Sequence, residues 1–210
     1  MRVSLIIFHK NINQYPKAWI DKFIESIRQQ TYKDFDVFEL NYGGTDEMIY
    51  EGSIFESLRM PTHADAHNYL LDKVFSMGYN YAFNTNVDDY YSPNRIERQL
   101  EYMNIANNRF DMVSSNFYNI DEENNIIRTC RFNQLNIANN LLSKNHNVIA
   151  HPACCYSKKF WLNCSKLNPL EIPRDDFELW KREIKKGARF YVVPDYLLYY
   201  SVHQNKVSKP

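Results

Sequence analysis

The first fifty residues alternate between apolar runs and amphipathic stretches, which is the pattern of an α/β fold. Val3 to Phe8 is a continuous apolar run, typical of a central strand buried on both faces. A second strand is predicted over Asp36 to Leu40, followed by a loop in which Gly43 and Gly44 allow tight turns. The segment between the strands predicts a helix ending near residue 30, because its apolar residues share one helical face: Trp19, Ile20, Phe23, Ile24 and Ile27. Strand, helix, strand and glycine-rich loop are the opening of a parallel sheet.

The stretch from Tyr79 to Arg98 organises the rest of the chain. An apolar strand over Tyr79 to Phe83 gives way to a polar loop containing Asp88 and Asp89, and Ser92-Pro93 then predicts a helix start. Ligands of open α/β sheets bind at the carboxyl ends of strands. Two adjacent carboxylates there favour a hard divalent cation, and the alternative is an ordinary acidic turn that caps the helix.

The second half of the chain continues the alternation of strands and helices. A helix over 64–76 precedes the acidic stretch, and three strands are predicted after it, over 112–118, 126–132 and 153–156. A helix opens at Asp175-Asp176 and closes at Gly187, and a strand over 190–193 is expected to end at Pro194. Without repeats or linkers, residues 1–210 are interpreted as a single α/β domain with a mostly parallel sheet flanked by helices.

Composition excludes several classes of partner. The 25 basic and 25 acidic side chains balance, which gives no reason to expect nucleic acid or an acidic membrane as a partner. The four cysteines match no zinc or disulfide pattern, and the N-terminal apolar run is too short for a signal peptide or a membrane span. A cytoplasmic protein with reduced thiols is therefore expected. Frequent Asn, Ile and Lys with scarce Gly are typical of an AT-rich genome, which is compatible with a giant virus and hence a host cytoplasm or virion location.

Six phrases in this order resemble the family-two glycosyltransferases of GT-A fold. They are VSLIIFHKN (3–11), QTYKDFD (30–36), NYGGTD (41–46), NVDDYYSPNRIERQ (86–99), DDFELW (175–180) and LYYSVHQNKVS (198–208). Each phrase alone is weak evidence, but their order and intervals together are specific. The resemblance covers nearly the whole chain. It implies a GT-A domain that moves a sugar from a nucleotide donor, with inversion, to a hydroxyl of a glycan or protein acceptor.

The resemblance also implies a site for the donor diphosphate. Asp88 occupies the second aspartate of the family's DxD motif and His203 matches its C-terminal histidine, so both are expected to bind Mn²⁺ or Mg²⁺. Asn86 replaces the first aspartate and is expected, with Val87, to face the ribose or donor sugar. Asp89 is expected to orient the loop, to contact the sugar or to cap the helix.

The nucleoside pocket is assigned through the same resemblance. Phe8 and His9 end the first strand, and Asn41 stands where the family has a base-reading aspartate. An amide oxygen can accept the uracil imide N–H, so UDP is the expected nucleotide, with glucose or a similar hexose as the sugar. His67 replaces the family's usual arginine near the nucleotide. The substitutions at Asn41, His67 and Asn86 leave the preferred base open.

Asp176 is the predicted catalytic base, and Asp175 is the second choice. A carboxylate beside the acceptor hydroxyl can take its proton as the new bond forms. Acidic residues also favour helix N-termini, so helix capping is the competing explanation for this pair.

Three other functions compete with an active transferase. The first is a degenerate domain that binds a nucleotide sugar without turnover. The second is a metal hydrolase built on His63, Asp65 and His67, and the third is a thiol enzyme using Cys155 with His151. Neither the acceptor nor the oligomeric state can be inferred from the sequence.

Overall fold

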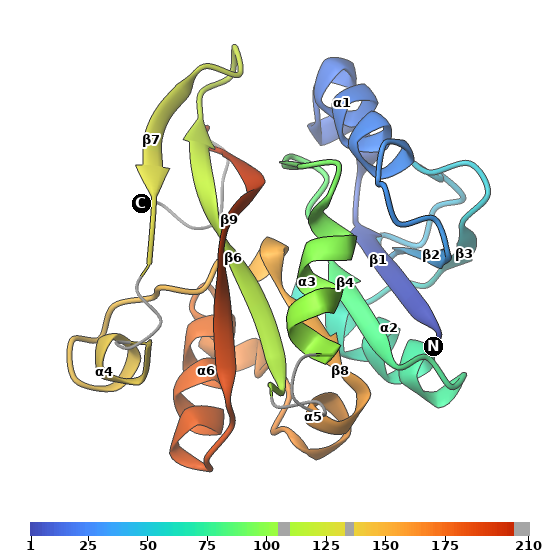
Figure 1. The fold of residues 1–210 in the computed structure, drawn as a ribbon. Coiled ribbons are helices and arrows are strands. Elements are labelled where there is room, and N and C mark those ends of the chain that lie inside the picture. Colours follow the sequence, from blue (N-terminus) through green and yellow to red (C-terminus); the bar gives the residue numbers. More distant parts are fainter. Residues whose placement is uncertain (105–109, 133–136, 204–210) are drawn as a thin grey trace.

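A computed structural model describes residues 1–104, 110–132 and 137–203, and the fold is α/β with one nine-stranded sheet (Figure 1). The strand order is β3-β2-β1-β4-β8-β6-β9-β5, with β7 paired to β6. The strands are β1 (Val3–His9), β2 (Phe35–Asn41), β3 (Ile54–Ser57), β4 (Tyr81–Asn84), β5 (Tyr90–Tyr91), β6 (Met112–Ile120), β7 (Ile126–Cys130), β8 (Cys155–Ser157) and β9 (Phe190–Ser201).

The long strand pairings are parallel, as the hydrophobic pattern predicts. Strands β3, β2, β1 and β4 form one parallel block, and β6 and β9 pair in parallel along their whole length. The short strand β8 joins the two blocks through antiparallel pairing with β4 and β6. The sheet therefore brings the end of β4, which precedes the acidic loop, and the end of β9, which precedes His203, into one structure.

Helices cover both faces of this sheet (Figure 1). Strand β1 alternates between the two cores: Ile6 packs with residues of α2, α5 and α6, whereas Leu5 and Ile7 pack with residues of α1 and α3. The helices are α1 (Lys17–Arg28), α2 (His63–Ser76), α3 (Arg95–Asn104), α4 (Ile137–Leu142), α5 (Lys158–Asn163) and α6 (Asp175–Lys185), and the short 3-10 turns are η1 (Ile12–Gln14), η3 (His151–Ala153) and η4 (Pro169–Glu171). Burial of β1 on both faces explains its continuous apolar sequence.

Two sequence expectations about element boundaries were wrong. Helix α3 begins at Arg95, so Ser92 and Pro93 lie in the preceding turn, where the Pro93 carbonyl accepts the N–H of Thr31. Pro194 does not end the last strand. It lies where the pairing of β6 and β9 shifts register. At such an irregularity the ladder does not need an N–H donor from the proline, so β9 continues to Ser201.

Candidate active site

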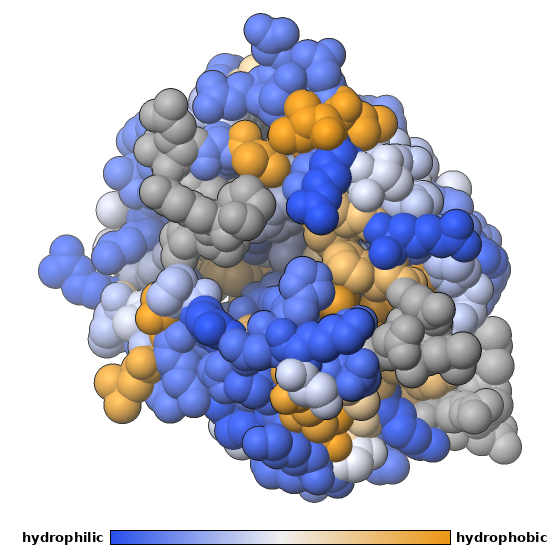
Figure 2. All heavy atoms as spheres, turned by 90° about the vertical axis from the view of Figure 1, so that its left-hand side faces the viewer, coloured by the Kyte–Doolittle hydropathy of each residue, from blue (hydrophilic) through white to orange (hydrophobic). Residues whose placement is uncertain are grey.

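A cavity of about 1300 Å³ opens at the carboxyl ends of β1 and β4. Figure 2 shows the face that lies at the left in Figure 1. This face is mostly hydrophilic and is hollowed near its centre. The predicted site residues that line the cavity are Phe8, Asn86, Val87, Asp88, Asp175, Asp176 and His203. The fold thus brings together the acidic loop, the start of α6 and the end of β9, which are far apart in sequence.

The acidic loop is fastened to the end of β9 through both aspartates. The Asp88 carboxylate oxygen Oδ2 lies 3.0 Å from His203 Nε2, and the Asp88 carbonyl accepts the hydroxyl of Ser201. Asp89 is buried, and its Oδ1 accepts the backbone N–H of Ser201 at 2.9 Å. Asp88 therefore faces the cavity, while the buried Asp89 holds the loop against the end of β9.

Aromatic and cationic side chains support this arrangement. The indole of Trp19 packs against His203 with ring centroids 4.8 Å apart. Tyr91 accepts the backbone N–H of Asn86 at 2.8 Å, and the guanidinium of Arg95 lies 4.2 Å from the Tyr91 ring centroid. Arg95 also donates to the Asn84 carbonyl at 2.7 Å. Both ends of the polar loop are thus held by side chains of the core.

The chemistry of Asp88 and His203 fits a divalent cation. Adjacent ligands of an octahedral ion bound at about 2.1 Å lie about 3 Å apart, which is the separation of Asp88 Oδ2 and His203 Nε2. Carboxylates bind Mg²⁺ and Mn²⁺, and imidazoles bind first-row transition metals, so this pair offers one ligand of each kind. In the described part of the chain no group of three His, Cys, Asp or Glu side chains is placed to hold a metal. An ion here would need oxygens from water or phosphate.

The two aspartates of α6 have different surroundings. Asp175 Oδ2 lies 3.2 Å from His63 Nε2 at the start of α2. One oxygen of Asp176 accepts the N–H of Phe177, and the other accepts the amide of Asn147 at 3.4 Å. Arg174, not either aspartate, is the residue that precedes the first turn of the helix.

These surroundings separate the pKa values of the two carboxyl groups. Burial raises the pKa of Asp176 above its usual value, and the charge of Asp175 adds to this although His151 opposes it. Burial also acts to raise the pKa of Asp175, but His63 and His151 outweigh it, so this pKa lies below the usual value. Neighbouring groups whose pKa values are pushed apart are typical of acid–base sites. Asp176 is the better proton acceptor of the pair.

The residues predicted to bind the nucleoside are only partly in the cavity. Phe8 lines it, and so does Tyr42, which the sequence did not single out. Asn41 is buried in the glycine-rich loop, where its side-chain oxygen accepts the N–H of Gly43 at 2.9 Å and its amide donates to Thr45 and Glu47. His9 is buried against Glu39 at 2.9 Å. The geometry therefore does not place Asn41 or His9 against a base in the cavity.

His67 lies beneath Phe8 and away from the cavity wall. Its ring is fully buried, and the centroids of Phe8, His151 and Trp161 lie 4.8 to 5.6 Å from it. Burial lowers the pKa of His67 well below its usual value, and the nearby His151 and His63 add to this effect. The neutral imidazole packs beneath Phe8 and His151, which line the cavity. It does not reproduce the charge of an arginine.

The structure disfavours the two rival sites. Asp65 closes a capping box with Thr62, and His67 is buried apart from it, so His63, Asp65 and His67 do not form a metal cluster. Cys155 is fully buried, and burial raises the pKa of its thiol. A thiol nucleophile needs exposure and a lowered pKa.

Besides Tyr42, sequence reasoning missed the part that His63, His151 and Trp19 play in the site. His63 was considered only as a hydrolase ligand, and His151 only as a partner of Cys155, yet both lie beside the α6 aspartates. Trp19 was assigned to the core face of α1 but reaches His203. The helical spacing of Trp19 gave no signal for this contact, since His203 lies far along the chain.

The fold is that of GT-A-like glycosyltransferases. Among solved structures, a fragment of S. aureus TarS (residues 1–349) in complex with UDP superimposes with a TM-score of 0.69 at 15% identity, covering 96% of this chain and 61% of that one. The mannosyltransferase PcManGT from Pyrobaculum calidifontis, in complex with GDP-Man and Mn²⁺, gives 0.65 at 12% identity, covering 98% and 58%. This chain spans about three fifths of those structures.

Two curated proteins are similar in sequence. The O-antigen biosynthesis glycosyltransferase WbnJ of Escherichia coli is 26% identical over 215 aligned positions, which cover 94% of this chain and 80% of WbnJ. The uncharacterized glycosyltransferase MJ1057 of Methanocaldococcus jannaschii is 26% identical over 201 positions, covering 89% and 67%. No family model matches the chain. None of the described helices combines the length and the apolar character that crossing a membrane requires.

Proposed function

We propose that this protein is a metal-dependent, inverting glycosyltransferase of family two, formed by a single domain over residues 1–210. It moves a hexose from a UDP-sugar to a hydroxyl of a glycan or protein. The observation that carries the proposal is that one cavity is lined both by Asp176 and by the Asp88–His203 pair. Support comes from similar structures, which include TarS in complex with UDP and PcManGT in complex with GDP-Man and Mn²⁺.

We assign roles to residues of the cavity from their positions in its wall. Asp88 and His203 would hold Mn²⁺ or Mg²⁺, and the bound ion would supply Lewis-acid neutralisation of the charge on the leaving diphosphate. Phe8 and Tyr42 line the wall that receives the nucleoside, and Asn86 and Val87 face the ribose or sugar. Asp176 accepts the proton of the attacking hydroxyl, and Asp175 keeps its charge through His63.

The test of the donor site is a calorimetric titration of UDP, with Mn²⁺ and with a chelator, into wild type and Asp88→Ala. We expect chelation and the substitution each to weaken UDP binding at least about tenfold, because each removes the ion that neutralises the diphosphate. The matched control is Asp34→Ala, an exposed aspartate outside the cavity. Equal affinity in all four conditions would show that the metal site is elsewhere.

The base preference is tested by competition of UDP against GDP and ADP at equal concentrations. Tighter binding of GDP would overturn the assignment of uracil. A protein that binds UDP with Mn²⁺ but neither transfers nor hydrolyses any sugar of a nucleotide-sugar panel would instead be the degenerate binding module.

A further inference from the structure

Two arginines that no proposed role uses lie in the wall of the cavity. Arg128 belongs to β7 and Arg131 follows it, and both side chains are exposed to the cavity. Ion pairs formed by other described arginines involve Arg98, Arg174, Arg182 and Arg189. Within the described ranges, neither Arg128 nor Arg131 lies within ion-pair distance of a carboxylate. Both guanidinium groups are therefore available to an anion.

The sheet explains why Arg128 faces the cavity. It is paired with Asn119 of β6, which in turn is paired with Tyr200 of β9. Residues directly opposite each other on paired strands project to the same face, and all three line the cavity. Just beyond Arg131, the N–H of Phe132 donates to the Asn116 side chain at 2.9 Å and fixes this segment to β6. Arg128 is thus presented by a paired strand, and Arg131 by the segment that this hydrogen bond ties to β6.

This wall is separate from the proposed metal pair. His203 follows β9, whereas Arg128 lies on β7, two strands away across β6. With strands about 4.8 Å apart, the two backbones are about 10 Å apart. The cavity of about 1300 Å³ also exceeds the roughly 300–1,000 Å³ of a typical pocket for one small ligand. There is room for a second ligand beside the nucleotide sugar.

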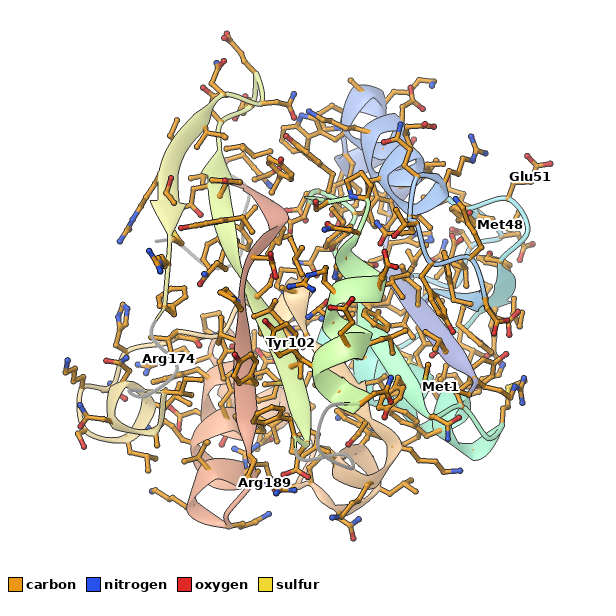
Figure 3. All side chains as sticks on the ribbon, viewed as in Figure 1. Met1, Met48, Glu51, Tyr102, Arg174 and Arg189 are labelled. Atoms are coloured by element: carbon orange, nitrogen blue, oxygen red, sulfur yellow. The ribbon has the colours of Figure 1, made fainter. Side chains whose placement is uncertain are left out.

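Several other charged side chains in the cavity already have partners. Asp175 lies beside His63, and Asp88 beside His203. Arg174, which Figure 3 shows at the left near α4 and the start of α6, lies 3.8 Å from Glu178 and its guanidinium is 4.6 Å from the Phe177 ring centroid. Glu122 is the carboxylate that lines the cavity from the same hairpin as Arg128. It offsets one of the two arginine charges on this wall.

We propose that Arg128 and Arg131 form an acceptor subsite for an anionic saccharide, held through a phosphate or a carboxylate. Guanidinium groups bind both anions through paired N–H donors. The proposal rests on the proposed transferase function and names its acceptor class. Arg128 and Arg131 determine which acceptor binds and take no part in the chemical step.

The test measures binding of glucose, glucose 6-phosphate, glucuronic acid and inorganic phosphate to the full chain with UDP and Mn²⁺ present. We expect one or both sugar acids to bind at least about tenfold tighter than glucose, and inorganic phosphate to bind more weakly than the preferred acid. The double variant Arg128→Gln/Arg131→Gln should lose about tenfold or more of this affinity, because contacts to charged groups are lost. Comparing the phosphate with the carboxylate sugar identifies the preferred anion.

The control variant is Lys185→Gln, which removes an exposed charge near the end of α6, away from the cavity. It should bind all probes as wild type does, and UDP affinity with Mn²⁺ should be unchanged in every variant. The proposal would be overturned if glucose and the acids bind equally well or if the acids do not bind. It would also be overturned if acid binding survives the double substitution. So would a loss of UDP affinity in the double variant, which would assign the arginines to the donor. Failure of the transferase proposal itself would appear separately, as absence of UDP binding in wild type.

Discussion

At the scale of single residues, the proposed catalysis depends on the difference between two neighbouring carboxylates. Asp176 faces the cavity with a raised pKa, while Asp175 lies 3.2 Å from His63 with a lowered one. A base must be charged to accept a proton, and a raised pKa makes it a stronger acceptor once charged. The first turn of α6 therefore presents one carboxylate with a raised pKa beside one with a lowered pKa.

Asp176→Asn keeps the size of the side chain but removes its ability to take a proton. We expect kcat to fall on the order of 10²- to 10⁴-fold, with donor affinity nearly unchanged. Asp175→Asn should be milder and serves as the matched control one residue away. Transfer rates and UDP-sugar affinity in both variants are the measurements. A reversed order of severity would make Asp175 the base, and near-full rates in both would place the base elsewhere.

The raised pKa of Asp176 also predicts the pH dependence of the reaction. As the pH falls through this pKa the carboxylate becomes protonated and stops accepting protons, so kcat should fall on the acidic side. The fall should begin at a higher pH than an ordinary aspartate, with a pKa near 3.8, would give. Profiles of kcat against pH for wild type and Asp176→Asn check this, since the residual activity of the variant should lack that acidic limb.

Site residues within motifs were easier to predict than residues that act across the fold. Asp88, His203 and Asp176 stand in recognisable phrases, and all three line the cavity. Asn41 also stands in such a phrase, but its amide closes the glycine-rich loop, where a side chain on Gly43 would meet the Lys10 carbonyl at 2.1 Å. Motif position shows which loop a residue belongs to, but the direction of a side chain depends on hydrogen bonds that the sequence does not display. The last motif residues, Val207 and Ser208, lie outside the described ranges.

At the scale of elements, the acidic loop depends on α3 for its shape. Arg95 is fully buried and donates to the Asn84 carbonyl at one end of the loop, while its guanidinium packs on the Tyr91 ring. Burial lowers the pKa of Arg95. Because Tyr91 in turn binds the Asn86 N–H, Arg95 positions the loop that carries Asp88 without touching the cavity itself.

Replacing Arg95 should weaken the proposed metal site although Arg95 does not line the cavity. We expect Arg95→Met to leave the Asn84 carbonyl without this donor, to reduce Mn²⁺ affinity about tenfold, and to lower the free energy of unfolding by about 1–3 kcal/mol. Arg95→Lys should recover part of the affinity. Mn²⁺ titration beside chemical denaturation is the measurement. The control is Arg98→Met, which removes a half-buried arginine of α3 that pairs with Glu101 and Asp195 outside the cavity. Unchanged Mn²⁺ affinity in a destabilised Arg95→Met protein would limit Arg95 to a structural role.

Elements with strong periodicity were predictable, and short or irregular ones were not. The helix over 64–76 and the strands at 3–8 and 112–118 match α2, β1 and β6 closely. Strands β3 and β5 were missed because four and two residues carry too little pattern. The end predicted at Pro194 was wrong because tertiary pairing with β6 resumes beyond the proline.

At the scale of the whole molecule, one continuous sheet joins all parts of the site. Strand β8 links the parallel block of β1 to β4 with the long pair of β6 and β9, and Asp88 meets His203 across 115 positions of sequence. Each of the two hydrophobic cores contains residues from both halves of the chain. Neither half can bury its apolar surface without the other.

We therefore expect residues 1–210 to unfold as one cooperative unit. Shared cores and a shared sheet leave no boundary at which one half can melt while the other stays folded. Calorimetry should give one transition, with a calorimetric enthalpy equal to the van't Hoff enthalpy. The fluorescence of Trp19, Trp161 and Trp180 should change together with the far-ultraviolet circular dichroism. Saturating UDP with Mn²⁺ should move this single transition upward, by about 2.7 kcal/mol in free energy at one hundred times Kd. Two separate transitions, or a ligand shift confined to one of them, would contradict the single-domain assignment.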